Sequence, residues 1–114
     1  MGTDENAVQR DLIRHAQEMF NVLAIRINSG RVKVRGGWMT LAPIGTPDLL
    51  FVLFGGRCCW LECKTPAGKL STDQARMHAE LRRRGHVVIV ASSRAEFLAG
   101  LATYESVQTG GYDD

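Results

Sequence analysis

The sequence predicts an α/β domain in which helices flank a mixed β-sheet, with the elements in the order αβββαβα. Three observations support this prediction. Apolar residues near the N-terminus recur at three- and four-residue spacing, which is typical of an amphipathic helix. Two apolar segments meet at a Gly-Gly-Arg turn, which indicates a β-hairpin. Two later helices begin with capping-box patterns on either side of an apolar strand.

The first half of the chain is expected to form a helix and a strand before the hairpin. The helix covers residues 4–20, with Thr3 or Asp4 as its N-cap. A strand follows at residues 22–28 and stops at an Asn-Ser-Gly turn. Residues 31–45 alternate basic and apolar side chains around two glycines, and we interpret them as an irregular strand and loop.

The second half begins with hairpin strands at residues 48–54 and 58–64. A helix then starts at the Ser71 capping box and runs to about Arg84, before a glycine. The apolar run that follows predicts a strand covered by helices, and a last helix ends near Leu101. Residues 1–114 are expected to form one domain, and about 105–114 a disordered tail.

Composition excludes several classes of protein. Apolar residues make up 45% and charged residues 23% of the chain, as in ordinary globular proteins. The net charge of +2 is too small for a strongly basic nucleic-acid binder, although basic residues gather locally. No apolar run approaches the roughly 20 residues that cross a bilayer, and the polar N-terminus lacks signal-peptide features. Cytoplasmic location is expected, with Cys58, Cys59 and Cys63 as reduced, mostly buried thiols.

Three charged residues on the apolar hairpin indicate chemistry. Alternation along a strand places Glu62 and Lys64 on one face, and counting outward from the turn brings Asp48 close to Glu62. Two adjacent carboxylates repel unless a cation neutralises them, and with the Cys63 backbone carbonyl they form the oxygen set that Mg²⁺ prefers. A Lys64 ammonium beside them can orient water or stabilise developing negative charge. This set suits the hydrolysis of a phosphodiester.

The motif Pro47-Asp48 followed by Glu62-Cys63-Lys64 resembles the signature of the PD-(D/E)XK nuclease superfamily, and more narrowly the pattern of the VRR-NUC family. The similarity to this family extends in order over nearly the whole chain. It comprises the segments ENAVQ (5–9), RINSG (26–30), GTPD (45–48), ECK (62–64), AGKLSTDQ (67–74) and GHVVIVASS (85–93).

The resemblance implies a restriction-endonuclease-like core and a Mg²⁺- or Mn²⁺-dependent DNA endonuclease. It implies that Asp48 and Glu62 are metal ligands and that Lys64 is the catalytic lysine. Glu5 would complete the metal shell directly or through water, and Gln74 would be an active-site glutamine. Free-standing members occur in phages and bacteria, and other members form the nuclease domains of DNA repair enzymes. Small members resemble junction-cleaving homodimers, so a Holliday-junction resolvase acting on four-way DNA is the expected function.

Other interpretations of the same residues remain open. The chain could instead be a flap or general DNA nuclease, a restriction-type nuclease, or an inactive DNA-binding module of this fold. Glu5 also suits the helix dipole, and Gln74 also completes a capping box. His15, His78 and His86 show no metal-ligand spacing and are interpreted as surface or half-buried residues; Trp38 is interpreted as a packing residue. The candidate phosphate contacts, for which ordinary surface charge is the alternative, are Arg26, Arg31, Lys33, Arg35 and Lys69.

Overall fold

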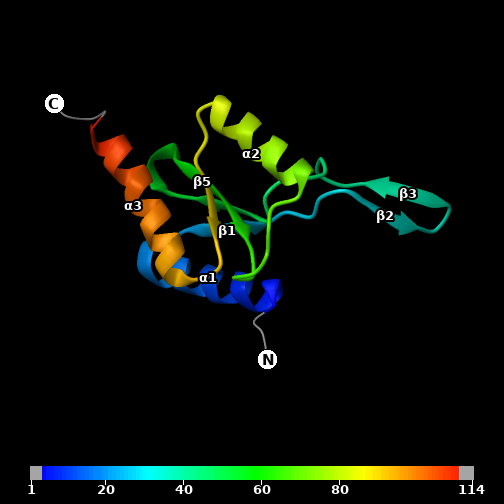
Figure 1. The fold of residues 1–114 in the computed structure, drawn as a ribbon, viewed down its shortest axis with the longest axis horizontal. Helices are drawn as coiled ribbons and strands as arrows, with labels where there is room; N and C mark the ends of the chain where they lie inside the picture. The colour runs from blue at the N-terminus through cyan, green and yellow to red at the C-terminus, as the bar shows by residue number, and fades with distance from the viewer. Residues whose placement is uncertain (1–3, 111–114) are drawn as a thin grey trace.

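The computed structural model describes residues 4–110, and it shows a mixed sheet with helices on both faces (Figure 1). In chain order the elements are α1 (Glu5–Phe20), β1 (Leu23–Arg26), β2 (Arg31–Val34), β3 (Gly37–Thr40), β4 (Leu49–Val52), a 3₁₀ turn (Phe54–Gly56), β5 (Cys58–Cys63), α2 (Thr72–Arg83), β6 (Val88–Ala91) and α3 (Arg94–Gly110). No helix among these residues is long and apolar enough to span a membrane.

The main sheet has four strands in the order β1-β4-β5-β6. Strands β1, β4 and β5 are antiparallel neighbours, whereas β6 runs parallel to β5 after the α2 crossover. This arrangement confirms the predicted mixed α/β sheet and is compatible with a restriction-endonuclease-like fold. The predicted hairpin joins β4 to β5 through the 3₁₀ turn, and Leu49 pairs with Leu61 at its far end.

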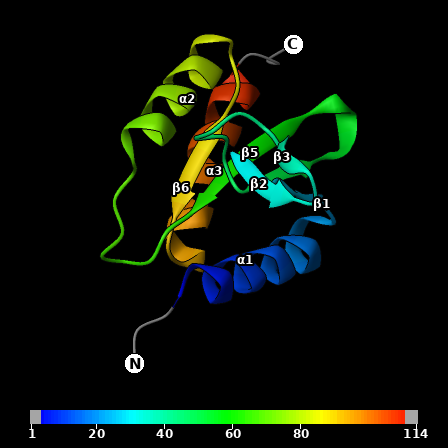
Figure 2. The ribbon, with the colours of Figure 1, turned by 90° about the vertical axis from the view of Figure 1, so that its right-hand side faces the viewer.

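The two faces of the sheet are covered differently. Helices α1 and α3 pack on one face, where the core includes Leu12 of α1, Phe97 of α3 and Leu61 of β5. The Phe97 ring meets the Phe51 ring edge to face, with centroids 5.7 Å apart. Figure 2 shows α2 on the side of the sheet opposite α1. Only one residue of α2, His78, is buried, so this helix is held with little apolar packing.

Capping residues set where the helices begin and end. The Asp4 carboxylate accepts a hydrogen bond of 2.7 Å from the Ala7 N–H and so starts α1. Ser71 and Gln74 form the predicted reciprocal capping box at the start of α2. After α2, Gly85 adopts a φ of 87°, which is the left-handed conformation expected of the glycine that ends a helix.

The structure differs from the predicted elements in three places. Residues 31–40 form a regular two-stranded hairpin, β2–β3, instead of an irregular strand and loop, because Gly36 supplies the positive φ of 90° that the turn needs. Helix α3 continues past Leu101 to Gly110, and residues 111–114 of the predicted tail lie outside the described residues. Val90 on β6 is 36% exposed, so the predicted helical cover of this strand is incomplete.

The three cysteines are free thiols, as expected. Cys59 and Cys63 are buried and Cys58 is half-buried. Burial raises the pKa of both Cys59 and Cys63 to about 12, so these side chains remain protonated at neutral pH. They are small residues of β5 that contribute to the core.

The buried Gly45 provides a test of how the loop before β4 meets α2. A Cβ atom on Gly45 would lie 2.3 Å from the Asp73 carbonyl oxygen, and its φ of 90° disfavours any side chain. We expect Gly45→Ala to lower the free energy of unfolding by about 3 kcal/mol, through steric overlap and backbone strain together. Urea unfolding of the purified variant measures this change.

Gly85→Ala is the matched control for this substitution. Gly85 has a similar φ of 87°, but a Cβ atom added there would find nothing within 4 Å. We expect a loss of about 1 kcal/mol from backbone strain alone. Equal losses in the two variants would contradict the close contact between Gly45 and α2.

Candidate active site

The register of the β4–β5 ladder places two carboxyl groups opposite each other. Leu49 pairs with Leu61, so the next position outward brings Asp48 across from Glu62, as the sequence predicted. The Asp48 side chain is half-buried, and its Oδ2 accepts a hydrogen bond of 2.9 Å from the Cys63 N–H. This bond holds one oxygen of Asp48 against the backbone of the strand that bears Glu62.

Glu62 is fully buried, with 0% of its surface exposed. Its Oε1 lies 2.9 Å from Nε2 of His78 on α2, a residue that is itself 1% exposed. Among the described residues, its Oε2 has no hydrogen-bond partner. A buried carboxyl oxygen without a partner is costly, so this atom is suited to accept a ligand.

The electrostatic surroundings keep this pair of buried groups uncharged. Burial and, after it, the adjacent Asp48 carboxyl together raise the pKa of Glu62 to about 9, against the opposing effect of Lys64. Burial likewise lowers the pKa of His78, assisted by the charges of Arg82 and Lys64. At neutral pH, therefore, Glu62 holds a proton when no cation is bound.

His78 is the site residue that the sequence analysis missed. Its sequence context indicates a surface or half-buried residue, whereas the structure places it in the interior against Glu62. The available signal was its position four residues after Gln74, on the same face of α2. His86 is exposed, as expected, and its Nδ1 accepts a hydrogen bond from the indole of Trp60 at 3.2 Å.

Lys64 directly follows β5, and its side chain is 14% exposed. Its ammonium lies 3.6 Å from Oε1 of Glu5, in the first turn of α1. A hollow of about 110 Å³ borders Lys64 and is also lined by Thr65, Gly68 and Ser92. The helix therefore brings Glu5 to the same end of the sheet as Asp48 and Glu62, but its carboxylate pairs with Lys64.

The other predicted residues occupy separate positions. The side-chain oxygen of Gln74 accepts a 2.9 Å hydrogen bond from the Ser71 N–H, so the structure shows its capping role. The predicted phosphate contacts are all exposed, and no ion pair forms at any of them among the described residues. They lie on β1 (Arg26), on β2 (Arg31 and Lys33), in the β2–β3 turn (Arg35) and in the loop before α2 (Lys69).

The donor atoms at this strand end fit a hard divalent cation. Asp48 and Glu62 offer carboxylate oxygens, and the Cys63 backbone offers a carbonyl. In residues 4–110, no three His, Cys, Asp or Glu side chains gather closely enough to enclose a metal. A Mg²⁺ ion that is held by only a few protein groups retains several waters.

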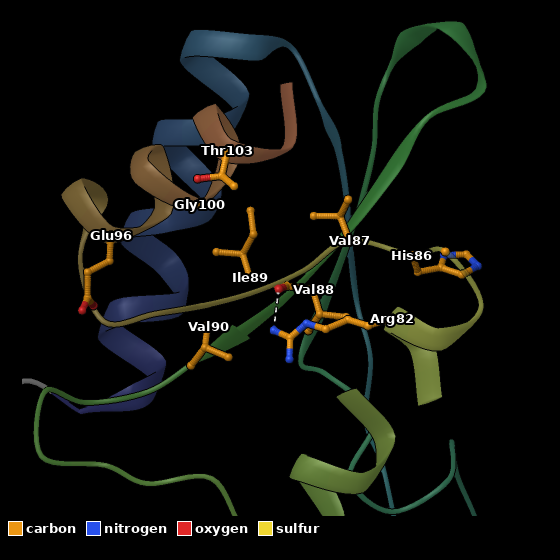
Figure 3. A pocket seen from close by; sticks show the side chains of 10 residues that line it. Arg82, His86, Val87, Val88, Ile89, Val90, Glu96, Gly100 and Thr103 are labelled. Atoms are coloured by element: carbon orange, nitrogen blue, oxygen red, sulfur yellow. Dashed lines mark hydrogen bonds between the residues drawn. The ribbon is translucent and has the colours of Figure 1, made fainter. Parts of the chain in front are cut away.

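A hollow larger than the one beside Lys64 lies elsewhere (Figure 3). This groove of about 460 Å³ runs beside β6, between α3 and the end of α2. It is lined by residues such as Arg82, Val88 and Glu96, and the Arg82 guanidinium donates a hydrogen bond to the Val88 carbonyl. None of the predicted catalytic residues lines it, so its size does not make it the candidate site.

The chain is similar in sequence to a phage protein. No family model matches the chain. Over 90 residues the chain is 29% identical to "Putative nuclease p44" of Acyrthosiphon pisum secondary endosymbiont phage 1, and the match covers 79% of this chain and 84% of the phage protein.

The raised pKa of Glu62 predicts that stability falls with increasing pH. In the folded protein the Glu62 carboxyl keeps its proton up to about pH 9. In the unfolded chain it loses the proton near its ordinary pKa of 4.5. Between these values the folded state binds more protons, so its free energy of unfolding decreases as the pH rises. In EDTA, we expect a decrease of about 1 kcal/mol from about pH 7 to about pH 8, measured by urea unfolding.

Glu62→Gln should remove this decrease, because the amide does not titrate. Glu80→Gln is the matched control: Glu80 pairs with Arg83 and Arg84, which lower its pKa to about 2, so it does not titrate in this window. In the folded protein, His78 and the buried thiols also keep their charge state there. If the free energy of unfolding of Glu62→Gln still decreased with pH in this range, the decrease could not be attributed to Glu62.

Proposed function

We propose that this protein is a metal-dependent endonuclease that hydrolyses phosphodiester bonds in DNA. The observation that supports this function best is the pairing of Asp48 with the buried Glu62 at the strand end that leads into Lys64. Paired carboxylates and an amine at one strand end are the groups that metal-assisted phosphodiester hydrolysis requires. The similarity to a phage protein named as a nuclease supports the same reaction class.

In this proposal, Asp48, Glu62 and the Cys63 carbonyl hold Mg²⁺ or Mn²⁺, with Glu5 joining directly or through water. The cation supplies Lewis-acid activation of a phosphoryl oxygen and of water. Lys64 contacts the phosphate and stabilises the negative charge that develops on it. The ion pair with Glu5 restrains the Lys64 side chain until DNA enters. Gln74 orders the loop that precedes α2 and contributes to the site through that loop.

The preferred substrate in this proposal is branched DNA, with the four-way junction as the specific form. A Holliday junction needs two symmetric cuts, and a homodimer with a two-fold axis places two identical sites for them. The exposed cations contact phosphates and give affinity that does not depend on sequence. They are Arg26, Arg31, Lys33, Arg35 and Lys69.

Cleavage of labelled DNA tests this function. With Mg²⁺ or Mn²⁺, the wild type should cut a four-way junction in paired, symmetric positions, and faster than a flap or a linear duplex. Lys64→Ala should lower the rate by about 100-fold or more, because it removes a charge aimed at the transition state. Electrophoresis of end-labelled strands measures both results.

Lys69→Ala is the matched control, since it removes an exposed lysine of the neighbouring loop that we assign to binding only. Its effect should be confined to affinity and should disappear at saturating enzyme. Cleavage restricted to flaps would retain the nuclease and discard the symmetric dimer. Binding without cleavage in either metal would contradict the nuclease assignment.

Metal binding should release a proton, because Glu62 is protonated in the metal-free protein at neutral pH. We expect the apparent affinity for Mg²⁺ to rise up to about tenfold per pH unit below about pH 9. Titration calorimetry in two buffers of different ionisation enthalpy measures the number of protons released. Binding in Glu62→Gln should be weaker and should release none. Release of the same number of protons from Glu62→Gln would show that another group gives up the proton.

A further inference from the structure

The β2–β3 hairpin forms an arm that projects away from the main sheet (Figure 1). All ten residues from Arg31 to Thr40 are exposed, so the arm contributes nothing to the core. The arm therefore needs an explanation other than stability of the fold. We name residues 31–40 the β-arm.

The register of the β-arm separates its side chains into two faces. Lys33 pairs with Trp38 and Arg31 with Thr40, so these four side chains share one face. Val32 pairs with Met39 on the opposite face. The result is one basic face with a single indole, and one apolar face.

The indole on the basic face is held in place on one side only. The Arg31 guanidinium lies over the Trp38 ring, 5.3 Å from its centroid, in a cation–π arrangement. Trp38 nevertheless remains 61% exposed, so the rest of the ring faces solvent. This combination provides a pre-oriented aromatic surface with positive charges beside it.

The base of the β-arm is joined by hydrogen bonds to the candidate active site. The Ile27 N–H, just after β1, donates a 2.8 Å bond to the Asp48 carbonyl. Beyond this bond, the backbones of Asn28 and Gly30 are hydrogen-bonded to Ala42 and Leu41, next to the start of β2 and the end of β3. The base of the β-arm is therefore attached to the backbone of Asp48, which relates a ligand on the basic face to the candidate site.

We propose that the β-arm binds an unpaired nucleotide of the DNA substrate, with its base stacked on Trp38 and its flanking phosphates on Arg31, Lys33 and Arg35. Stacking on aromatic side chains beside cations is how proteins bind single strands without reading their sequence. This inference rests on the proposed nuclease function and names a feature of its substrate: bases left unpaired near a branch. It also changes our sequence-based interpretation of Trp38 as a packing residue.

The exposed indole favours an unpaired base over the two other partners. In a duplex the faces of the bases are already stacked on one another, so a perfect duplex offers Trp38 only phosphates and groove edges. A second copy of the chain would bury the apolar face, with Val32 and Met39, and would meet like charge if it covered the basic face. Only an unpaired nucleotide uses both the indole and the three cations.

Fluorescence anisotropy in EDTA tests the proposal without cleavage. The probes are a labelled single strand, the same sequence as a duplex, and an abasic strand of equal length. We expect Trp38→Ala to weaken binding of the single strand about tenfold and to leave the abasic strand nearly unchanged. Trp38→Phe should retain most of the affinity, and Thr40→Ala, on the same face, should match the wild type.

A second measurement keeps Trp38 in place, so its result does not depend on whether the β-arm still folds in Trp38→Ala. The chain has two tryptophans, so Trp60→Phe leaves Trp38 as the only one. Its emission should be quenched by the single strand and not by tripolyphosphate, which supplies charge without bases. Absence of quenching at saturating single strand would overturn the proposal.

Three further results would also overturn it. They are equal losses of affinity for all three probes in Trp38→Ala, unchanged single-strand binding in that variant, and a change in its sedimentation that marks the β-arm as a subunit contact. The outcome is separate from that of the proposed function. Stacking without cleavage of any DNA would contradict the nuclease function and support this inference. Cleavage by the wild type, with unaltered DNA binding in Trp38→Ala, would support the nuclease function and contradict this inference.

Discussion

The burial of the Glu62 carboxyl between β5 and α2 is the constraint on which the rest of this structure depends. A carboxyl group without water must be neutral, paired or bound to a cation, and Glu62 meets this requirement through its raised pKa and the His78 imidazole. His78 is also the only buried residue of α2. The polar contact thus attaches the helix to the sheet as well as orienting the carboxyl. For this reason a substitution at the candidate site should alter the packing of α2, and a shift of α2 should alter the position of the Glu62 carboxyl.

The fold could be predicted where a local pattern and a turn determine the outcome. Alternation on β5 and outward counting from the turn place Asp48 opposite Glu62, and Ser71 with Gln74 predict the start of α2. His78 could not be found in this way, because a lone histidine on a helix does not reveal which strand its face will meet. The β-arm was missed for a related reason: both of its faces are exposed, so it lacks the buried apolar face by which a strand is usually detected.

The chemistry of the site is distributed over three elements, of which the hairpin pattern connects only β4 and β5. Asp48 precedes β4, Glu62 and Lys64 come from β5 and the residue after it, and Glu5 comes from the first turn of α1. The register of the sheet brings the first three together. Glu5 reaches the same place because α1 packs on the face of the sheet that carries the core. The Lys64–Glu5 pair is half-exposed on the Glu5 side, and such pairs contribute little stability. Its value to the protein is therefore the position that it gives to the ammonium group.

Two carboxylates and a lysine can activate any phosphodiester, and nothing in their arrangement distinguishes a branched DNA from a linear one. Selection of a substrate must come from a surface that touches DNA away from the scissile bond. The β-arm has the position for this, because the segment that leads from β1 into β2 is hydrogen-bonded to the Asp48 carbonyl at Ile27. Through this connection, the position at which an unpaired base stacks determines where the DNA backbone meets the carboxylates. In this view the distance of the cut from a branch is a property of the β-arm, and the rate of cutting is a property of the site.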